Sequence, residues 1–291
     1  MPAEPLHRCR LLASPWASVH ATAIESARHY GRHWHATFGL GVIDDGAHRS
    51  ASGQGAVDAF AGDIVTTNPG EVHDGRPLGA PVRRWRTVYI EPDLVATLAA
   101  EAGLPADAVF DAAAFRDEPL RRAVLGLLDA MAQWTSQPGS AAAALACEQA
   151  LVHACSRMLH DHAGVRAVEG APDAAALPLV LERLAADTLA APSLAELAAL
   201  AGLGRFQLLR RFARAHGTSP HAWWLQHRAE RARTLIARGT AIAEAAAQAG
   251  FADQPHLTRV FVRRYGFTPG AWQAAMARPR AQERSRRTSP G

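Results

Sequence analysis

The last third of the chain repeats itself, and this repeat constrains the fold more than any other feature of the sequence. The segment from Leu194 to Leu203 recurs 48 residues later, as the segment from Ile242 to Phe251. Beyond Phe251 the spacing becomes 49 residues, and it matches five further pairs: Arg210 with Arg259, Phe212 with Phe261, Gly217 with Gly266, Pro220 with Pro269 and Trp223 with Trp272. Two copies of one helical unit are therefore predicted, with one extra residue in a loop just after Phe251.

The first copy has the pattern of a helix-turn-helix unit. Ser193 is suited to cap the N-terminus of a first helix, and Glu196, three residues later, completes a capping box. Gly202 stands where the turn needs a residue that tolerates a positive φ. A second helix is predicted over residues 205–215, and Gly217 ends it.

The second copy follows the same pattern. Gly250 is its turn residue, and Asp253 is a good N-cap for a helix that runs to about Tyr265. A long helix over residues 221–238 joins the two copies. Two units held by one rigid helix suit successive major grooves on one face of DNA, about 34 Å apart.

The second helix of such a unit lies in the major groove, with its N-terminal residues at the base edges. The residues predicted at those positions are Arg205, Phe206, Gln207, Arg210, Gln254, His256, Thr258 and Arg259. Arginine pairs with guanine through two hydrogen bonds and glutamine pairs with adenine, so these side chains suit the reading of bases.

The charge distribution supports a nucleic-acid partner. The chain has no lysine, and all 31 of its basic residues are arginines. Residues 180–291 hold 17 arginines against 7 acidic residues, whereas residues 1–179 carry a net charge of −6. An Arg-rich solvated surface on an ordinary helical bundle is the alternative explanation. The repeat, the caps, the two turn glycines and the charge together favour binding to double-stranded DNA.

The N-terminal part has the sequence pattern of β-strands instead of helices. Short apolar runs over residues 38–43, 63–67 and 86–90 alternate with turn clusters, which predicts a sandwich or small barrel of strands. Two amphipathic helices follow, over residues 118–134 and 141–160. These helices either cover the strands or pair with a second copy of the chain.

The composition sets the domain count and excludes some classes of protein. With 291 residues the length suggests about two domains, and no apolar run is long enough for a membrane span. The first ten residues lack the apolar segment of a secretory signal, and three cysteines form neither a disulfide framework nor a zinc spacing. We therefore expect a cytoplasmic protein.

The domain boundaries follow from these patterns. We expect an effector-binding and dimerisation domain over residues 1–163, and a linker rich in Gly, Pro and Ala over 164–177. A DNA-binding domain over 178–278 and a basic, disordered tail over 279–291 complete the chain.

The repeat carries a resemblance to a known family. Residues 178–275, and above all the run AGFADQPHLTRVFVRRYGFTPGAW at 249–272, resemble the DNA-binding domain of AraC/XylS-type transcriptional regulators. The N-terminal half resembles the cupin-like effector domain of the same family. The resemblance implies an α+β protein with a cupin-like β-barrel, a seven-helix domain with two helix-turn-helix units, and dimerisation through the helices after the barrel.

The resemblance also implies roles for single residues. It places DNA contacts at six of the residues named above: Arg205, Phe206, Arg210, Gln254, His256 and Arg259. Pro255 departs from the polar residue common at its position; a proline fits the first helical turn, so the helix is kept and the base contact is not expected.

Three histidines resemble the two cupin motifs. His33 and His35, then His73 after Asn68-Pro-Gly, correspond to motif histidines that converge inside the barrel of metal-binding cupins. Three imidazoles suit a divalent metal, but no Glu follows His35 at the expected distance. We therefore expect no metal and no cofactor, and assign His33, His35, His73 and Trp85 to the binding of a small effector.

The sequence thus predicts a regulator of transcription, not an enzyme. It would bind promoter DNA, respond to a small molecule in the barrel, and have RNA polymerase and a second copy of itself as further partners. Two rival readings stay open: a metal-dependent cupin enzyme that uses His33, His35 and His73, and an architectural nucleic-acid binder without an effector.

Overall fold

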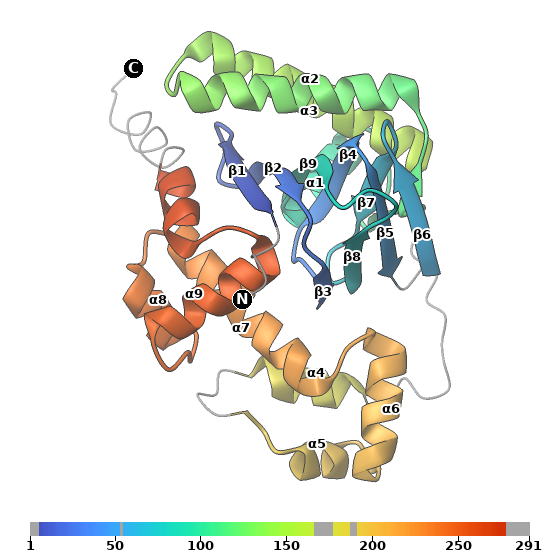
Figure 1. Ribbon diagram of the computed structural model, residues 1–291, viewed down its shortest axis with the longest axis vertical. Helices are drawn as coiled ribbons and strands as arrows, with labels where there is room; N and C mark the ends of the chain where they lie inside the picture. Colours follow the sequence, from blue (N-terminus) through green and yellow to red (C-terminus); the bar gives the residue numbers. More distant parts are fainter. Residues whose placement is uncertain (1–5, 53–54, 166–176, 187–190, 278–291) are drawn as a thin grey trace.

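The N-terminal half of the computed structural model consists of two facing sheets covered by helices (Figure 1). The structure describes residues 6–52, 55–165, 177–186 and 191–277. The larger sheet of this part runs in the order β1 (His7–Ala13), β2 (Val19–Ser26), β9 (Arg83–Ile90), β4 (Phe38–Asp45), β7 (Ile64–Thr67) and β11 (Ala114–Phe115). The smaller runs β3 (Tyr30–His33), β8 (His73–Pro77), β5 (Ala47–Ser52) and β6 (Gly55–Phe60). The pairings assigned to the larger sheet are all antiparallel.

The centre of the larger sheet is closely packed because β4 carries glycines where neighbouring side chains approach. A Cβ atom at Gly39 would overlap the Thr67 hydroxyl, and one at Gly41 would lie 2.6 Å from Thr87 Oγ1. The described strands do not pair into a closed ring, so the domain is a two-sheet sandwich and is cupin-like only in a loose sense.

Helices close one side of the sandwich. α1 (Pro92–Glu101), α2 (Glu118–Ser136) and α3 (Ala141–His162) share one apolar core with the larger sheet. Asp117 caps α2 by accepting from the backbone N–H of Leu120 at 2.8 Å, and Ser140 caps α3. A short pair of strands, β10 (Ala108–Phe110) and β12 (Ala163–Val165), ties the end of α3 back to the loop before α2. The predicted helices at 118–134 and 141–160 are thus confirmed, each slightly longer than expected.

The C-terminal half is helical and forms two small cores. Its helices are α4 (Leu177–Ala185), α5 (Leu194–Leu200), α6 (Arg205–His216), α7 (Pro220–Ala237), α8 (Ile242–Gln248) and α9 (Gln254–Tyr265), and residues 269–277 are also helical. Phe212 and Phe261, a matched pair of the repeat, are both fully buried, one in each core. α7 contributes Trp224 to the first core and Ala232 to the second, so it joins the two copies as predicted. The two-domain α+β class is confirmed.

One predicted capping box forms only in part, and two predicted segments lie outside the described residues. Ser193 caps α5, but the carboxylate of Glu196 bonds to Arg183 at 2.7 Å, so the predicted capping box is only half formed. Most of the predicted linker (166–176) and the predicted tail (279–291) lie outside the described residues. Among the described helices, none is long and apolar enough to cross a membrane.

The turn glycines of the two copies have the predicted backbone but different surroundings. Gly202 has φ +62° and Gly250 has φ +77°. A Cβ at Gly202 would meet open space, whereas one at Gly250 would lie 2.7 Å from the guanidinium of Arg228. That guanidinium is held by a hydrogen bond to the carbonyl of Ala249 at 2.7 Å and by the ring of Trp224.

This pair provides a matched test of the turn. Gly202→Ala should lower the free energy of unfolding by about 1–2 kcal/mol, the cost of a left-handed backbone for a residue with a Cβ. Gly250→Ala should cost about 1–3 kcal/mol more, because the held guanidinium cannot move away freely. Urea unfolding of both variants checks this, and equal losses would show that Arg228 does not restrict the second turn.

Candidate effector chamber and nucleic-acid interface

A chamber of about 110 Å³ lies between the two sheets. Both sheets and the loops at their ends contribute to its wall. Its apolar lining comes from Ile24, Ile43, Val57, Ala59, Val65 and Trp85. This volume exceeds the roughly 10–15 Å³ that one water requires on the same measure, so the space can hold a small molecule. The chamber combines an apolar wall with a few polar groups, as ligand sites do.

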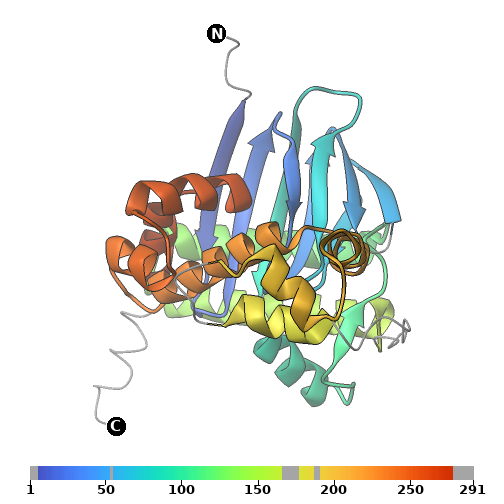
Figure 2. The ribbon, with the colours of Figure 1, turned by 90° about the horizontal axis from the view of Figure 1, so that it is seen from below.

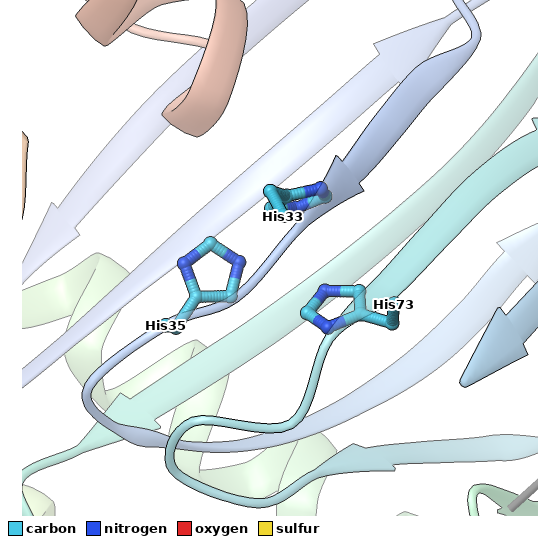
Figure 3. A group of neighbouring side chains, drawn as sticks. All are labelled: His33, His35 and His73. Atoms are coloured by element: carbon cyan, nitrogen blue, oxygen red, sulfur yellow. The ribbon is translucent and has the colours of Figure 1, made fainter. Parts of the chain in front are cut away.

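Three predicted histidines converge in this chamber (Figure 3). His33 ends β3, His35 lies in the loop that follows, and His73 begins β8, where it pairs with His33 across the sheet. Each offers one ring nitrogen such that the three atoms lie within 4.8 Å of one another. The pairing of β3 with β8 therefore brings His33 and His73 together from positions 40 residues apart, and the loop after β3 adds His35.

Backbone carbonyls fix two of these rings. His33 Nδ1 donates to the carbonyl of Gly31 at 2.7 Å, and His73 Nδ1 donates to the carbonyl of Glu71 at 2.9 Å. A proton on Nδ1 leaves Nε2 of a neutral ring as an acceptor. Burial holds the pKa values of His33 and His35 well below that of free histidine, and it also lowers the pKa of His73. The chamber thus presents neutral imidazoles at neutral pH.

Trp85 lines the chamber from β9, and three arginines of the same strand lie on either side of it in the sequence. Arg83 is fully buried, donates to Nδ1 of His48 at 2.9 Å and lies over the Trp85 ring at 4.7 Å. Arg84 and Arg86 instead form ion pairs on the other face, Arg86 with Asp44 at 2.9 Å. Of the three arginines, Arg83 supports the chamber wall, whereas the others do not line the chamber.

The C-terminal half completes the chamber wall. Arg264 and Tyr265, at the end of α9, are among its lining residues. The ring of Tyr265 lies 6.0 Å from that of His35, and its buried hydroxyl has no hydrogen-bond partner among the described residues. Neither residue is among those predicted for the effector site, because Tyr265 has the pattern of an ordinary core aromatic of the repeat.

The two halves dock through matched glycines. Gly217 and Gly266 end α6 and α9 in the left-handed conformation and correspond in the repeat. Arg32 donates to the carbonyl of Gly217 at 2.6 Å, and His7 Nε2 donates to the carbonyl of Gly266 at 2.7 Å. Arg264 in turn donates to the carbonyl of Arg32 at 2.7 Å. Each helix-turn-helix unit is therefore held to the sandwich at the C-terminus of its second helix.

Buried contacts from α7 and the last helical segment extend this docking. Gln226 donates to the carbonyl of Trp34 at 2.9 Å, and Arg233 reaches Glu91 at 3.3 Å. His20 stacks on Tyr89 of the chamber wall at 5.0 Å and meets Trp272 edge-on at 4.6 Å. Figure 2 shows the helical half lying along one end of the sheets.

The predicted DNA-contact residues of the first unit lie at the exposed start of α6. Arg205, Phe206, Gln207 and Arg210 are all exposed, and Phe206 is 81% accessible, an unusual degree for a large apolar side chain. The amide oxygen of Gln207 accepts from the backbone N–H of Gly204 at 3.1 Å, so this side chain also caps the helix.

The second unit presents fewer free side chains. Gln254 and Arg259 are exposed on α9, whereas Thr258 and His256 are half-buried, His256 with its ring against Phe251. Asp253 caps the helix by accepting from the backbone N–H of His256 at 2.6 Å.

Two further exposed arginines extend the same faces. Arg214 lies one turn after Arg210 on α6, and Arg263 lies one turn after Arg259 on α9. They are also 49 residues apart, so they correspond in the repeat. Continuing the four-residue step along each helix would have identified both from the sequence.

Comparison with known proteins gives matches in both halves. The family model described as an AraC-like ligand binding domain matches residues 15–154, and one described as a helix-turn-helix domain matches residues 197–275. The HTH-type transcriptional regulator YbfI of Bacillus subtilis (strain 168) is 25% identical over 233 residues, which is 78% of this chain and 81% of YbfI.

Two further similarities are partial or distant. The transcriptional activator NphR of a Rhodococcus species is 33% identical over 87 residues, 30% of this chain and 26% of NphR. The crystal structure of ToxT from Vibrio cholerae O395 aligns over 93% of this chain and 98% of its own, with 10% identity and a TM-score of 0.47.

The docking of the two halves can be tested at Gln226. Gln226→Leu removes a buried donor and leaves the Trp34 carbonyl unpaired, so it should lower the free energy of unfolding by about 1–3 kcal/mol. Gln248→Leu is the matched control, because Gln248 is an exposed residue of α8 whose side-chain amide donates to Glu244 of the same helix. Urea unfolding and hydrogen exchange at β3 measure the effect, and equal behaviour of the two variants would contradict a docked interface.

Proposed function

The chain belongs to the AraC-type transcriptional regulators, and from this premise we propose how its two halves work together. It is a DNA-binding regulator whose N-terminal domain binds a small-molecule effector. The observation that carries the mechanism is the chamber wall: Arg264 and Tyr265, which line the space for the effector, are the last two residues of α9, the recognition helix of the second unit.

Effector binding would act on the docking of this helix. A molecule that contacts His33 or His35 shares the chamber with Tyr265, and it changes the free energy of docking by as much as its affinity differs between the docked and released states. Arg264 extends the link, since it also bonds to the carbonyl of Arg32, the residue that holds Gly217 of the first unit. One ligand can thus alter the placement of both recognition helices.

The DNA contacts come from the exposed faces of α6 and α9. We assign base reading to Arg205, Phe206, Gln207, Arg210, Gln254, His256, Thr258 and Arg259, and phosphate contacts to Arg214 and Arg263. The joining helix α7 has 18 residues, about 27 Å at 1.5 Å per residue. This length is comparable with the roughly 34 Å between successive major grooves.

The remaining parts of the proposal follow from the family. We place His33, His35, His73 and Trp85 in the effector site, and we propose that the chain regulates transcription without being an enzyme. We expect RNA polymerase to be its partner at promoters. We propose that the protein is located in the cytoplasm, with the chromosome. The domains are assigned to residues 1–163 and 178–278.

Sequencing of genomic fragments that bind the purified protein at moderate salt tests the function. A shared motif with two elements spaced about one helical turn apart supports a double reader. Recovery of fragments without any shared motif would contradict sequence-specific binding.

The arginines of the recognition helices provide a sharper test. Arg210→Ala and Arg259→Ala should each weaken binding to the recovered motif by about 1–3 kcal/mol, roughly 5- to 150-fold, with little effect on scrambled DNA. Arg122→Ala is the control, because Arg122 is an exposed arginine of α2 in the other domain. Equal weakening on both DNAs, measured by fluorescence anisotropy, would assign these residues to phosphates.

We also propose a homodimer formed through α3. Leu145 and Val152 are 54% and 47% exposed and stand seven residues apart, so they share one face of this helix. Leu145→Glu should shift the protein from dimer to monomer in light scattering, because the interface would bury an unpaired charge. Leu200→Glu, at an exposed position of α5, is the control and should leave the molecular mass measured by light scattering at that of the dimer. A monomeric parent protein would refute this assignment.

A further inference from the structure

The three histidines of the chamber have the arrangement of a metal-binding site. Their converging nitrogens come from β3, the loop after it, and the start of β8. At least two of the rings already donate Nδ1–H to backbone carbonyls, those of Gly31 and Glu71. Metal-binding histidines are commonly oriented in this way, because the bond at one nitrogen fixes the ring and leaves the other nitrogen for the metal.

We propose that His33, His35 and His73 bind one divalent first-row transition metal ion, with Zn²⁺ as its simplest occupant. Three neutral imidazoles are a donor set that suits Zn²⁺ and its neighbours in the periodic table. At bond lengths of about 2.0–2.1 Å, nitrogens in a tetrahedral site lie about 3.4 Å apart. The present separations, within 4.8 Å, therefore require only small side-chain movements.

The surroundings favour a cation over an apolar ligand alone at this point. Glu71 lines the chamber two residues before His73, and its Oε1 is buried without a hydrogen-bond partner among the described residues. Its Oε2 accepts from the backbone N–H of Asn68 at 3.0 Å. A buried carboxylate oxygen without a donor is costly, and a divalent ion nearby would offset that cost.

The sequence predicts no metal here because no Glu follows His35. Glu71 instead stands in the second motif region, and only the fold brings it to the same chamber. Three protein ligands leave at least one coordination position for a ligand in the chamber, as in open zinc sites. An effector with an oxygen donor such as a carboxylate would fill it, a role that rests on the proposed function.

Metal binding by the untagged full-length chain tests the site. After treatment with a chelator and buffer exchange, the protein is titrated with Co²⁺ and Zn²⁺, and the visible absorption of Co²⁺ reports nitrogen coordination. We expect one metal per chain by elemental analysis and a rise in melting temperature on addition of Zn²⁺. Absence of stoichiometric binding by the parent protein would overturn the proposal without the need for a variant.

Variants then assign the ligands. His73→Gln and His35→Gln should each weaken Zn²⁺ binding at least about tenfold, as disturbance of a metal site does. His153→Gln is the matched control, because His153 is an exposed histidine of α3 outside the chamber. Unchanged affinity in both chamber variants would overturn the assignment, with circular dichroism to verify the fold. DNA binding of the metal-free protein is measured in parallel, so failure of the metal site is distinguished from failure of the proposed regulator.

Discussion

Two backbone carbonyl groups, at the C-terminal ends of α6 and α9, accept hydrogen bonds that hold the helical half to the sandwich. Gly217 and Gly266 adopt a left-handed backbone, which ends each helix and turns its carbonyl toward the sandwich. Arg32 and His7 donate to these carbonyls. A side chain at either glycine would meet the docked surface, with Val72 near Gly217 and Tyr30 near Gly266. The same glycine thus ends the helix and permits the close approach of the two halves.

This arrangement separates the two ends of each recognition helix. The N-terminal turns of α6 and α9 carry the exposed side chains suited to base edges, whereas the C-terminal ends contact the sandwich. In the proposed mechanism, a change at the chamber would therefore reach the side chains assigned to DNA contacts through a rigid helix rather than through a loop. For α9 the helix end is itself part of the chamber wall, at Arg264 and Tyr265.

Arg233 and Glu230 form a buried ion pair at the interface between the two halves. Arg233 bonds to Glu230 at 2.8 Å within α7 and reaches Glu91 of the N-terminal half at 3.3 Å. Its backbone carbonyl accepts from the indole N–H of Trp272 at 2.9 Å, which anchors the last helical segment. Breaking one member of such a buried network leaves an uncompensated charge, so the network favours one placement of the two halves over others.

The sequence by itself determined the repeat, the helices of its two copies, the two helices that follow the strands, and part of the strands. Local signals such as Ser193, Asp253 and the turn glycines act within a few residues, so they could be identified without the fold. The exposed arginines of the recognition helices follow from the same helical period.

The convergence of His33 and His35 with His73 could be predicted only through a resemblance to a known family. The local sequence pattern does not show which strands pair across 40 residues. Glu71, Arg264 and Tyr265 could not be assigned to the chamber at all. Their positions depend on how two separately folded halves dock, and docking is decided by shape and by hydrogen bonds between residues as distant as His7 and Gly266. Only the tertiary structure places the end of α9, a helix of the DNA-binding repeat, in the wall of the chamber between the two sheets.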